Sequence, residues 1–153
     1  MKKHLTKFLL AAIASASLLT VHAEELKWHT DLPKAQVEAK TDKKLVMLDF
    51  TGSDWCGWCI KLNKEVFSTP EFAEFAKKNL VLVEVDFPRK KQLSAEQKKA
   101  NQELQSKYQI QGYPTLIVLD ADGNKVGELG YVAGGPKAWI AKFEKETKAK
   151  SKS

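Results

Sequence analysis

The sequence is poor in the residues that bind metals and prosthetic groups. Its 153 residues include two cysteines and three histidines. Of the histidines, only His29 lies after residue 23. A structural zinc site needs four ligands, which two cysteines and His29 do not supply. Iron–sulfur clusters need more cysteines. A c-type haem needs a histidine directly after the second cysteine, where this chain has Ile60. The sequence therefore predicts no metal and no prosthetic group.

The net charge of the chain is also small. The formal net charge is +6, but three lysines lie in the first 23 residues, which hold no acidic residue, so the remainder carries +3. The remaining lysines concentrate at 89–99 and 142–152, without interleaved aromatic residues. Solvated helix faces explain these clusters better than a nucleic-acid surface. With 43% hydrophobic and 29% charged residues, the chain is predicted to form one globular domain.

The longest apolar segment, residues 8–19, is too short to span a bilayer comfortably, because a span needs about 20 residues. Three lysines precede or begin this segment, and Val21-His22-Ala23 supplies compact residues where a signal peptidase cleaves. No cysteine directly follows the segment, so a lipid anchor is not indicated. We predict a signal peptide over residues 1–23, cleaved after Ala23, with an uncleaved anchor as the alternative. The protein is then exported, to the periplasm or an equivalent compartment where disulfides persist.

The pattern after residue 23 alternates strands and helices. Leu45 to Phe50 is an almost continuous apolar run, which is typical of a central strand buried on both faces. The expected strands are 24–30, 45–50, 80–85, 116–119 and 125–131, and the expected helices are 32–41, 56–67, 70–79, 94–108 and 136–147. This order predicts an α/β fold with a mixed sheet and helices on both faces. We expect one domain over residues 24–147 and a disordered basic tail over 148–153.

The two cysteines lie in the segment Trp55-Cys56-Gly57-Trp58-Cys59, between a predicted strand and a predicted helix. A Cys-x-x-Cys pair at such a junction indicates a redox dithiol. A purely structural disulfide is the alternative, but closing so short a loop stabilises a fold only weakly. Cys56 begins the helix, where the helix dipole favours a thiolate, so we predict that it is the nucleophile. Cys59, one turn further in and more buried, would be the resolving thiol.

These residues resemble the thioredoxin superfamily, and the resemblance extends over nearly all of the chain after residue 23. It rests on Asp49-Phe50, the cysteine segment, Gly112-Tyr113-Pro114-Thr115, and the hairpin glycines Gly123 and Gly130. The stretch from Cys56 to Pro70 is similar to the C-terminal thiol domain of the bacterial transmembrane reductase DsbD. The resemblance implies a thioredoxin fold. Two segments, 51–54 and 87–107, are longer than in ordinary thioredoxins, and the second is a candidate partner-specific surface.

The resemblance also implies roles for Asp49, Tyr113 and Pro114. Asp49 would be a buried general base of raised pKa that accepts the Cys59 proton. The alternative is a strand-end acid that faces solvent. The Tyr113–Pro114 bond is expected to be cis, which is otherwise rare. Its loop would face the cysteines, and the Tyr113 backbone would pair with an extended client segment.

Four further residues are predicted to contact clients. Trp55 and Trp58 would form an exposed apolar rim, although Trp55 packs inward in an alternative arrangement. Gly57 lies between the cysteines and, with Trp58, tunes the reduction potential. Gly130 would allow a client backbone to approach closely, or it is an ordinary glycine at a strand end.

By this resemblance the chain is expected to be a thiol–disulfide oxidoreductase that reduces disulfides in exported proteins. Its electrons would come from a membrane thiol donor, and it would work as a monomer without a cofactor other than the Cys56–Cys59 couple. A disulfide oxidase or isomerase is one alternative. A redox-inactive module that binds clients as a chaperone is another.

Overall fold

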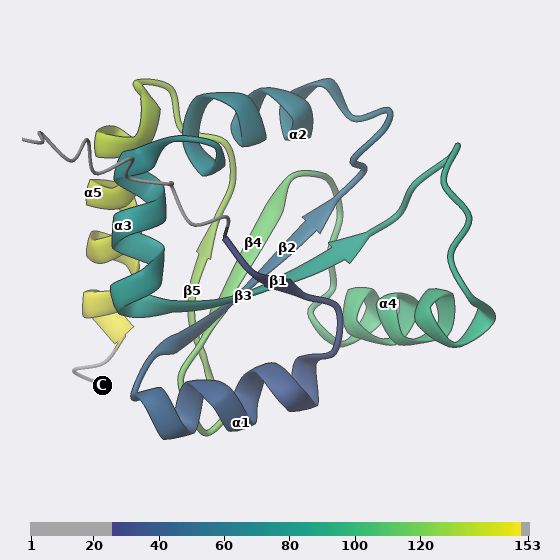
Figure 1. Cartoon of the computed structure of the whole chain (residues 1–153), viewed down its shortest axis with the longest axis horizontal. Helices are drawn as coiled ribbons and strands as arrows, with labels where there is room; N and C mark the ends of the chain where they lie inside the picture. Colours follow the sequence, from purple (N-terminus) through teal and green to yellow (C-terminus); the bar gives the residue numbers. More distant parts are fainter. Residues whose placement is uncertain (1–25, 151–153) are drawn as a thin grey trace, which may run out of the picture.

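The computed structural model describes residues 26–150, with side chains described through residue 148. These residues form a five-stranded sheet in the order β1-β3-β2-β4-β5 (Figure 1). β1, β3 and β2 are parallel, whereas β4 and β5 are antiparallel to their neighbours, so the predicted mixed sheet and α/β class are confirmed. The strands are β1 (Trp28–His29), β2 (Leu45–Thr51), β3 (Leu80–Asp86), β4 (Thr115–Leu119) and β5 (Lys125–Leu129). The helices are α1 (Leu32–Asp42), α2 (Gly57–Leu62), the π-helical turn η1 (Asn63–Phe67), α3 (Pro70–Asn79), α4 (Ala95–Lys107) and α5 (Gly135–Lys150).

Local capping residues determine where several helices begin. Asp31, Thr69 and Ser94 precede α1, α3 and α4, and the side chain of each accepts a hydrogen bond from the backbone N–H three residues later, at 3.0, 3.3 and 3.1 Å. Each bond satisfies one of the N–H groups that a helix leaves unpaired at its start. The Gln97 side chain donates to Asn101 at 2.8 Å. Ser94 therefore caps α4 as predicted, while the Gln97 side chain bonds within α4 and also donates to the backbone oxygen of Thr30 at 3.1 Å.

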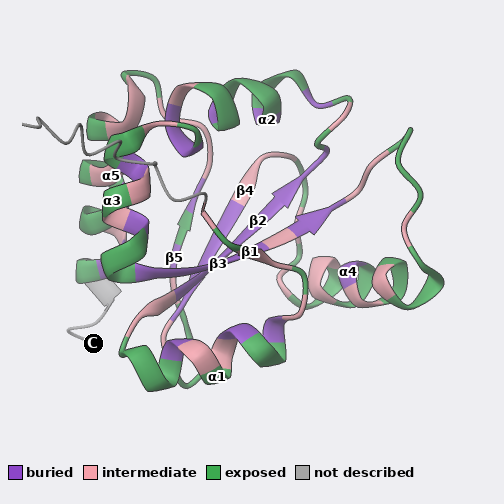
Figure 2. Ribbon diagram, in the orientation of Figure 1, coloured by how far each residue is buried: buried purple, intermediate pink, exposed green. Residues whose placement is uncertain are grey.

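Helices cover both faces of the sheet, as predicted. Along β2, Met47 packs in a cluster with η1, α3 and α5, whereas Val46 and Leu48 pack in a second cluster with α1 and α4. This alternation follows from the two-residue period of a strand, whose successive side chains point to opposite faces. Figure 2 shows the strands largely buried and the outer surfaces of the helices exposed. The core thus consists of two apolar layers, one on each side of β2 and β3.

Some element ends differ from the sequence prediction. β5 ends at Leu129, which pairs with Leu116 near the start of β4, so little partner strand is left for a longer β5. α5 continues to Lys150, past the predicted domain boundary at residue 147. A Glu144–Lys148 ion pair of 3.3 Å, one helical turn apart, supports this extension. The predicted signal peptide and residues 151–153 of the predicted tail lie outside the described residues.

Candidate active site

Cys56 and Cys59 form a disulfide at the N-terminus of α2, with their Cα atoms 5.2 Å apart. Figure 1 shows the chain leaving the carboxyl end of β2 and entering α2 through a short loop. Cys56 is the N-cap residue, and its Sγ accepts a hydrogen bond from the Cys59 backbone N–H at 3.2 Å. A donor so placed, together with the positive end of the helix dipole, favours negative charge on the Cys56 sulfur after reduction.

The two cysteines are almost equally buried in the disulfide form, with 7% of Cys56 and 5% of Cys59 exposed. The sequence prediction that Cys59 is the more buried holds only by this small margin. The residues therefore differ in their place in the helix more than in their exposure. Cys56 sits at the cap, where N–H groups are unpaired, whereas Cys59 lies within the first turn.

Asp49 is buried beneath this segment and does not face solvent as a strand-end acid would. It lines a cavity of about 250 Å³ together with Cys59, Thr51, Ser53 and Glu84. Among the described residues its Oδ1 atom is buried and has no hydrogen-bond partner. Burial, followed by the nearby carboxylates of Glu84 and Asp86, raises the pKa of Asp49 from 3.8 to about 8. The pKa of Asp49 is therefore close to the ordinary pKa of a cysteine thiol, which is about 8.5.

Glu84 is a second carboxylate in this cavity, and the sequence interpretation did not single it out. The parallel register of β2 and β3 pairs Asp49 with Glu84. Asp49 lies two residues after Met47, and Glu84 lies two residues after Leu82, so both acids are on the same face of the sheet as these core residues. This face is covered by η1, α3 and α5. Burial and Asp86 raise the pKa of Glu84, and Lys91 opposes this effect. One signal in the sequence could have identified Glu84: it is the single acid within the apolar run 80–85, just as Asp49 is the single acid within the apolar run 45–50.

The two tryptophans differ in how they are held. Trp55 is 36% exposed, and its Nε1–H donates to the backbone oxygen of Phe87 at 2.8 Å. The Arg89 guanidinium lies 3.9 Å from the centroid of the Trp55 ring, a cation–π distance. Trp58 is 58% exposed and packs against the ring of Tyr131 with centroids 5.1 Å apart. Both side chains therefore reach the surface, and the hydrogen bond to Phe87 holds Trp55 in place there.

The predicted loop before β4 lies beside Trp55. The Tyr113–Pro114 peptide bond is cis, as predicted. The Tyr113 ring packs edge-on against Trp55, with ring centroids 6.0 Å apart. A Cβ atom at Gly130 would lie 3.5 Å from the backbone oxygen of Pro114, which places Gly130 next to the same loop. A Cβ atom at Gly57 would meet no atom within 4 Å, so this glycine faces open space.

The segment that follows β3 is fastened to the loop that precedes Cys56. Asp86 accepts hydrogen bonds from the Ser53 backbone N–H at 2.9 Å and from its hydroxyl at 2.6 Å. The Asp54 carboxylate accepts from the backbone N–H groups of residues 89, 90 and 91. The longer loop at 51–54 thus has a structural use, because Ser53 and Asp54 both hold the 86–91 segment. The sequence predicted only a basic loop at 87–93.

Comparison with known proteins agrees with this geometry. A family model described as a thioredoxin-like domain matches residues 32–146. The chain belongs to the thioredoxin-like family. It is 39% identical over 128 residues to a protein named disulfide bond reductase DsbH from Chlamydia pneumoniae, covering 84% of this chain and 76% of the relative. It is 31% identical over 130 residues to thioredoxin-related protein DsbJ from the same organism, covering 81% of this chain and 37% of that longer protein.

Solved structures place this thioredoxin-like chain in the thioredoxin fold. A structure titled DsbH oxidoreductase superposes with a TM-score of 0.78 and 34% identity, covering 97% of this chain and 95% of that one. The oxidised C-terminal domain of DsbD from Neisseria meningitidis has a TM-score of 0.54 at 21% identity, covering 78% of this chain and 99% of that one. The second similarity extends to the fold alone.

Residues 26–150 of this thioredoxin-like protein contain neither a candidate metal site nor a helix that could span a membrane. No group of three or more histidine, cysteine, aspartate or glutamate side chains in this range is arranged to hold a metal ion. None of the helices in the same range combines the length and the apolar character that crossing a membrane requires.

Proposed function

We propose that this protein is an exported thiol–disulfide oxidoreductase that reduces disulfides in exported client proteins. The observation that carries the proposal is the Cys56–Cys59 disulfide at a helix N-terminus, above a buried carboxylate and beside a cis-proline loop. The similarity to a protein named disulfide bond reductase supports the reducing direction. No cofactor takes part in the proposed reaction, because the dithiol itself carries both electrons.

In the reduced protein, the Cys56 thiolate attacks one sulfur of a client disulfide. A mixed disulfide forms between Cys56 and the client, and the other client sulfur leaves as a thiolate. The Cys59 N–H that binds Cys56 Sγ in the disulfide stabilises the attacking thiolate before this step. Client binding uses the exposed face of Trp58 and the backbone beside Pro114, next to which Gly130 lies.

Resolution of the mixed disulfide requires a second thiolate. The Cys59 thiol gives its proton to the Asp49 carboxylate across their shared cavity, and the Cys59 sulfur then attacks Cys56 Sγ. The client leaves with two reduced cysteines, and the Cys56–Cys59 disulfide remains. Two electrons have passed from the dithiol to the client. The raised pKa of Asp49 suits this role, since proton transfer between groups of similar pKa is not strongly uphill.

The proposal is tested by cysteine variants in an insulin reduction assay. Cys56→Ser should abolish reduction, because the nucleophile is missing. Cys59→Ser is the matched control: it should also fail to turn over but should accumulate a mixed disulfide with the client, which is visible on non-reducing gels. Wild-type turnover by Cys56→Ser would refute the mechanism. If Cys56→Ser still bound unfolded clients and the wild type reduced none, the redox-inactive chaperone function would replace this proposal.

The direction of electron flow is tested by the reduction potential of the Cys56–Cys59 couple in glutathione buffers. A reductase should have a potential of about −250 mV or lower, whereas an oxidant would lie near −120 mV. In the cell, we propose that a membrane thiol protein re-reduces the disulfide after each cycle, and that the protein acts as a monomer. Export is tested separately, because the mature protein recovered from a secreting host should begin at Glu24.

A further inference from the structure

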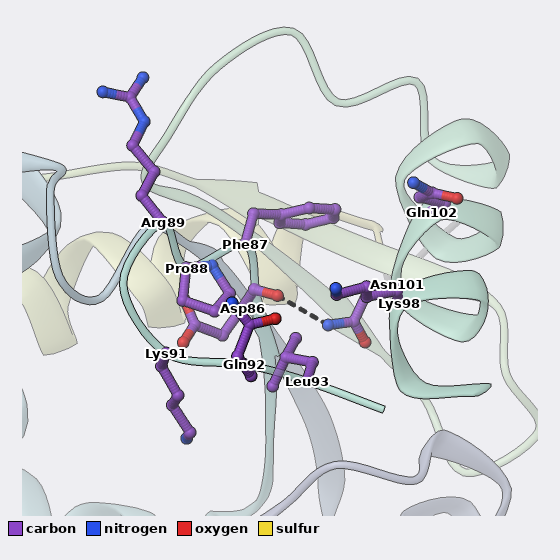
Figure 3. Close-up of a pocket in the computed structure, with 10 residues that line it drawn as sticks. All are labelled: Asp86, Phe87, Pro88, Arg89, Lys91, Gln92, Leu93, Lys98, Asn101 and Gln102. Atoms are coloured by element: carbon purple, nitrogen blue, oxygen red, sulfur yellow. Dashed lines mark hydrogen bonds between the residues drawn. The ribbon is translucent and has the colours of Figure 1, made fainter. Parts of the chain in front are cut away.

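A second cavity, of about 260 Å³, lies between the segment after β3 and the start of α4 (Figure 3). We call its surroundings the basic ledge, which comprises residues 86–93 together with Lys98, Asn101 and Gln102 of α4. Phe87, Pro88 and Leu93 supply apolar surface in this cavity. Figure 3 shows Arg89 and Lys91 extending away from the segment in different directions.

The basic ledge is held in a defined shape although most of it has no regular secondary structure. Asp54 accepts hydrogen bonds from three consecutive backbone N–H groups of the segment, at 2.9, 2.7 and 3.2 Å. On the other side, the buried Asn101 side chain donates to the backbone oxygen of Asp86 at 2.7 Å (Figure 3). A segment fixed at both sides loses little further conformational entropy when a ligand binds.

The ledge is continuous with the active site. The Phe87 ring stacks on Tyr113 with centroids 5.3 Å apart, and the Phe87 backbone oxygen accepts the Trp55 indole N–H. Arg89 covers one face of the Trp55 ring. A client held beside Pro114 with its cysteine at Cys56 would therefore extend from the Trp55–Tyr113 pair directly onto the ledge.

The ledge is positively charged. It carries Arg89, Lys90, Lys91 and Lys98, all of which are exposed. Within residues 26–148, no ion pair of 4.0 Å or less joins any of these four side chains to a carboxylate. A negatively charged ligand would offset the mutual repulsion of these like charges.

The acids near the ledge do not cancel this charge. The Asp86 carboxylate is buried and bound by Ser53, and the Asp54 carboxylate is bound by backbone N–H groups. Glu84 is a third nearby acid, which interacts with Lys91. Counting these three acids against the four cations still leaves a formal excess of one positive charge. A ligand at the cavity would therefore meet exposed cationic side chains together with the apolar surface of Phe87, Pro88 and Leu93.

We propose that the basic ledge is a client-selecting surface, which binds an acidic segment of the client close in sequence to the cysteine that Cys56 attacks. This inference rests on the proposed oxidoreductase function. Carboxylates of the client lie against the exposed cations, and an apolar client side chain enters the cavity beside Phe87 and Leu93. Complementary charge raises mainly the rate of association, so the selection is expressed in kcat/KM and weakens as salt increases.

The test uses two disulfide-containing peptides that are identical except for their flanking residues, which are aspartate and glutamate in one and lysine in the other. The readout is the ratio of kcat/KM for the acidic peptide to that for the basic peptide. The wild type should prefer the acidic peptide by about tenfold or more at low ionic strength, within the range of electrostatic steering. The variant Lys91→Glu/Lys98→Glu should lose or reverse this preference, since neither side chain contacts Trp55.

The matched control is Lys137→Glu/Lys145→Glu, which makes the same change of net charge on exposed positions of α5. It should keep the wild-type ratio, and because the readout is a ratio within one variant, partial unfolding does not alter it. An unchanged ratio in Lys91→Glu/Lys98→Glu, or an equal loss in the control, would overturn the ledge as a selecting surface while leaving the oxidoreductase function standing. If the wild type reduced neither peptide, the proposed function itself would fail and the inference with it.

Discussion

The substitution Asp49→Asn isolates the titration of the buried carboxyl group, because asparagine has nearly the same shape and no proton to lose near neutral pH. In the folded protein, burial and then Glu84 and Asp86 raise the pKa of Asp49 from 3.8 to about 8. In the unfolded chain the pKa returns to its ordinary value of about 3.9. Between these two pH values, the folded protein binds a proton that the unfolded chain has released. Its free energy of unfolding therefore falls as the pH rises.

The size of this effect follows from the pKa difference. Each pKa unit corresponds to about 1.4 kcal/mol. The stability contributed by the protonated Asp49 is fully present below about pH 4 and is lost as the pH rises toward about 8. Between pH 5 and pH 8 the wild type should lose about 4 kcal/mol from this group, and the Asn variant should not. Glu84 titrates in both proteins, so its own contribution largely cancels when the two are compared.

The assay is urea unfolding of both proteins with the disulfide intact, followed by tryptophan fluorescence at several pH values from 5 to 8. The difference in unfolding free energy should move by about 4 kcal/mol in favour of Asp49→Asn across this range. Any cost of burying the asparagine amide adds a constant that does not change the slope. Asp122→Asn, at an exposed acid in the hairpin turn, is the control and should run parallel to the wild type. A difference between wild type and Asp49→Asn that stayed constant within about 1 kcal/mol would refute the raised pKa.

Three further predictions concern the surroundings of the site. Glu84→Gln removes a negative charge beside Asp49, so the pKa of Asp49 should fall below about 8, and repeating the Asp49→Asn comparison in this background should show the pH-dependent difference ending at lower pH. Trp55→Phe removes the hydrogen bond to the Phe87 oxygen and should lower the urea unfolding free energy by about 1 kcal/mol, more than Trp58→Phe at the more exposed ring; equal losses would contradict the anchoring role of Trp55. Gly52→Ala places a Cβ atom 2.5 Å from the Trp55 ring and should cost about 1–3 kcal/mol, measured by the same unfolding assay, whereas Gly57→Ala, which points into open space, should change stability by less than about 0.5 kcal/mol.

Features that depend on neighbouring residues were predictable from the sequence. Asp31, Thr69 and Ser94 cap the helices that follow them, because each side chain reaches an N–H only three residues away. The apolar run of β2 predicted a strand buried on both faces, and this is confirmed. The pairing of Cys56 with Cys59 likewise needs only the geometry of one helical turn.

The sequence also placed the cis-proline loop, but by resemblance to a family and not by local physics. The Tyr113–Pro114 bond is cis as expected. By contrast, the length of β5 was overestimated, since a strand can extend only as far as its partner. The end of α5 was placed too early, because the tail composition suggested disorder although Glu144 and Lys148 are spaced to support another turn.

What the chain could not reveal by itself is which distant residues meet around the disulfide. Only the β2–β3 register brings Glu84 beside Asp49, 35 positions earlier, and the shared burial of the two carboxylates then raises the pKa of Asp49. Only the folded loop allows Asp54 to bind backbone N–H groups at 89–91 and so turns a basic segment into a fixed surface. The sequence thus determined the dithiol, the helix starts and the strand faces, since these are set within a few residues. Tertiary packing decided the electrostatics of the buried acid and the shape of the basic ledge, since both depend on contacts between segments far apart in the chain.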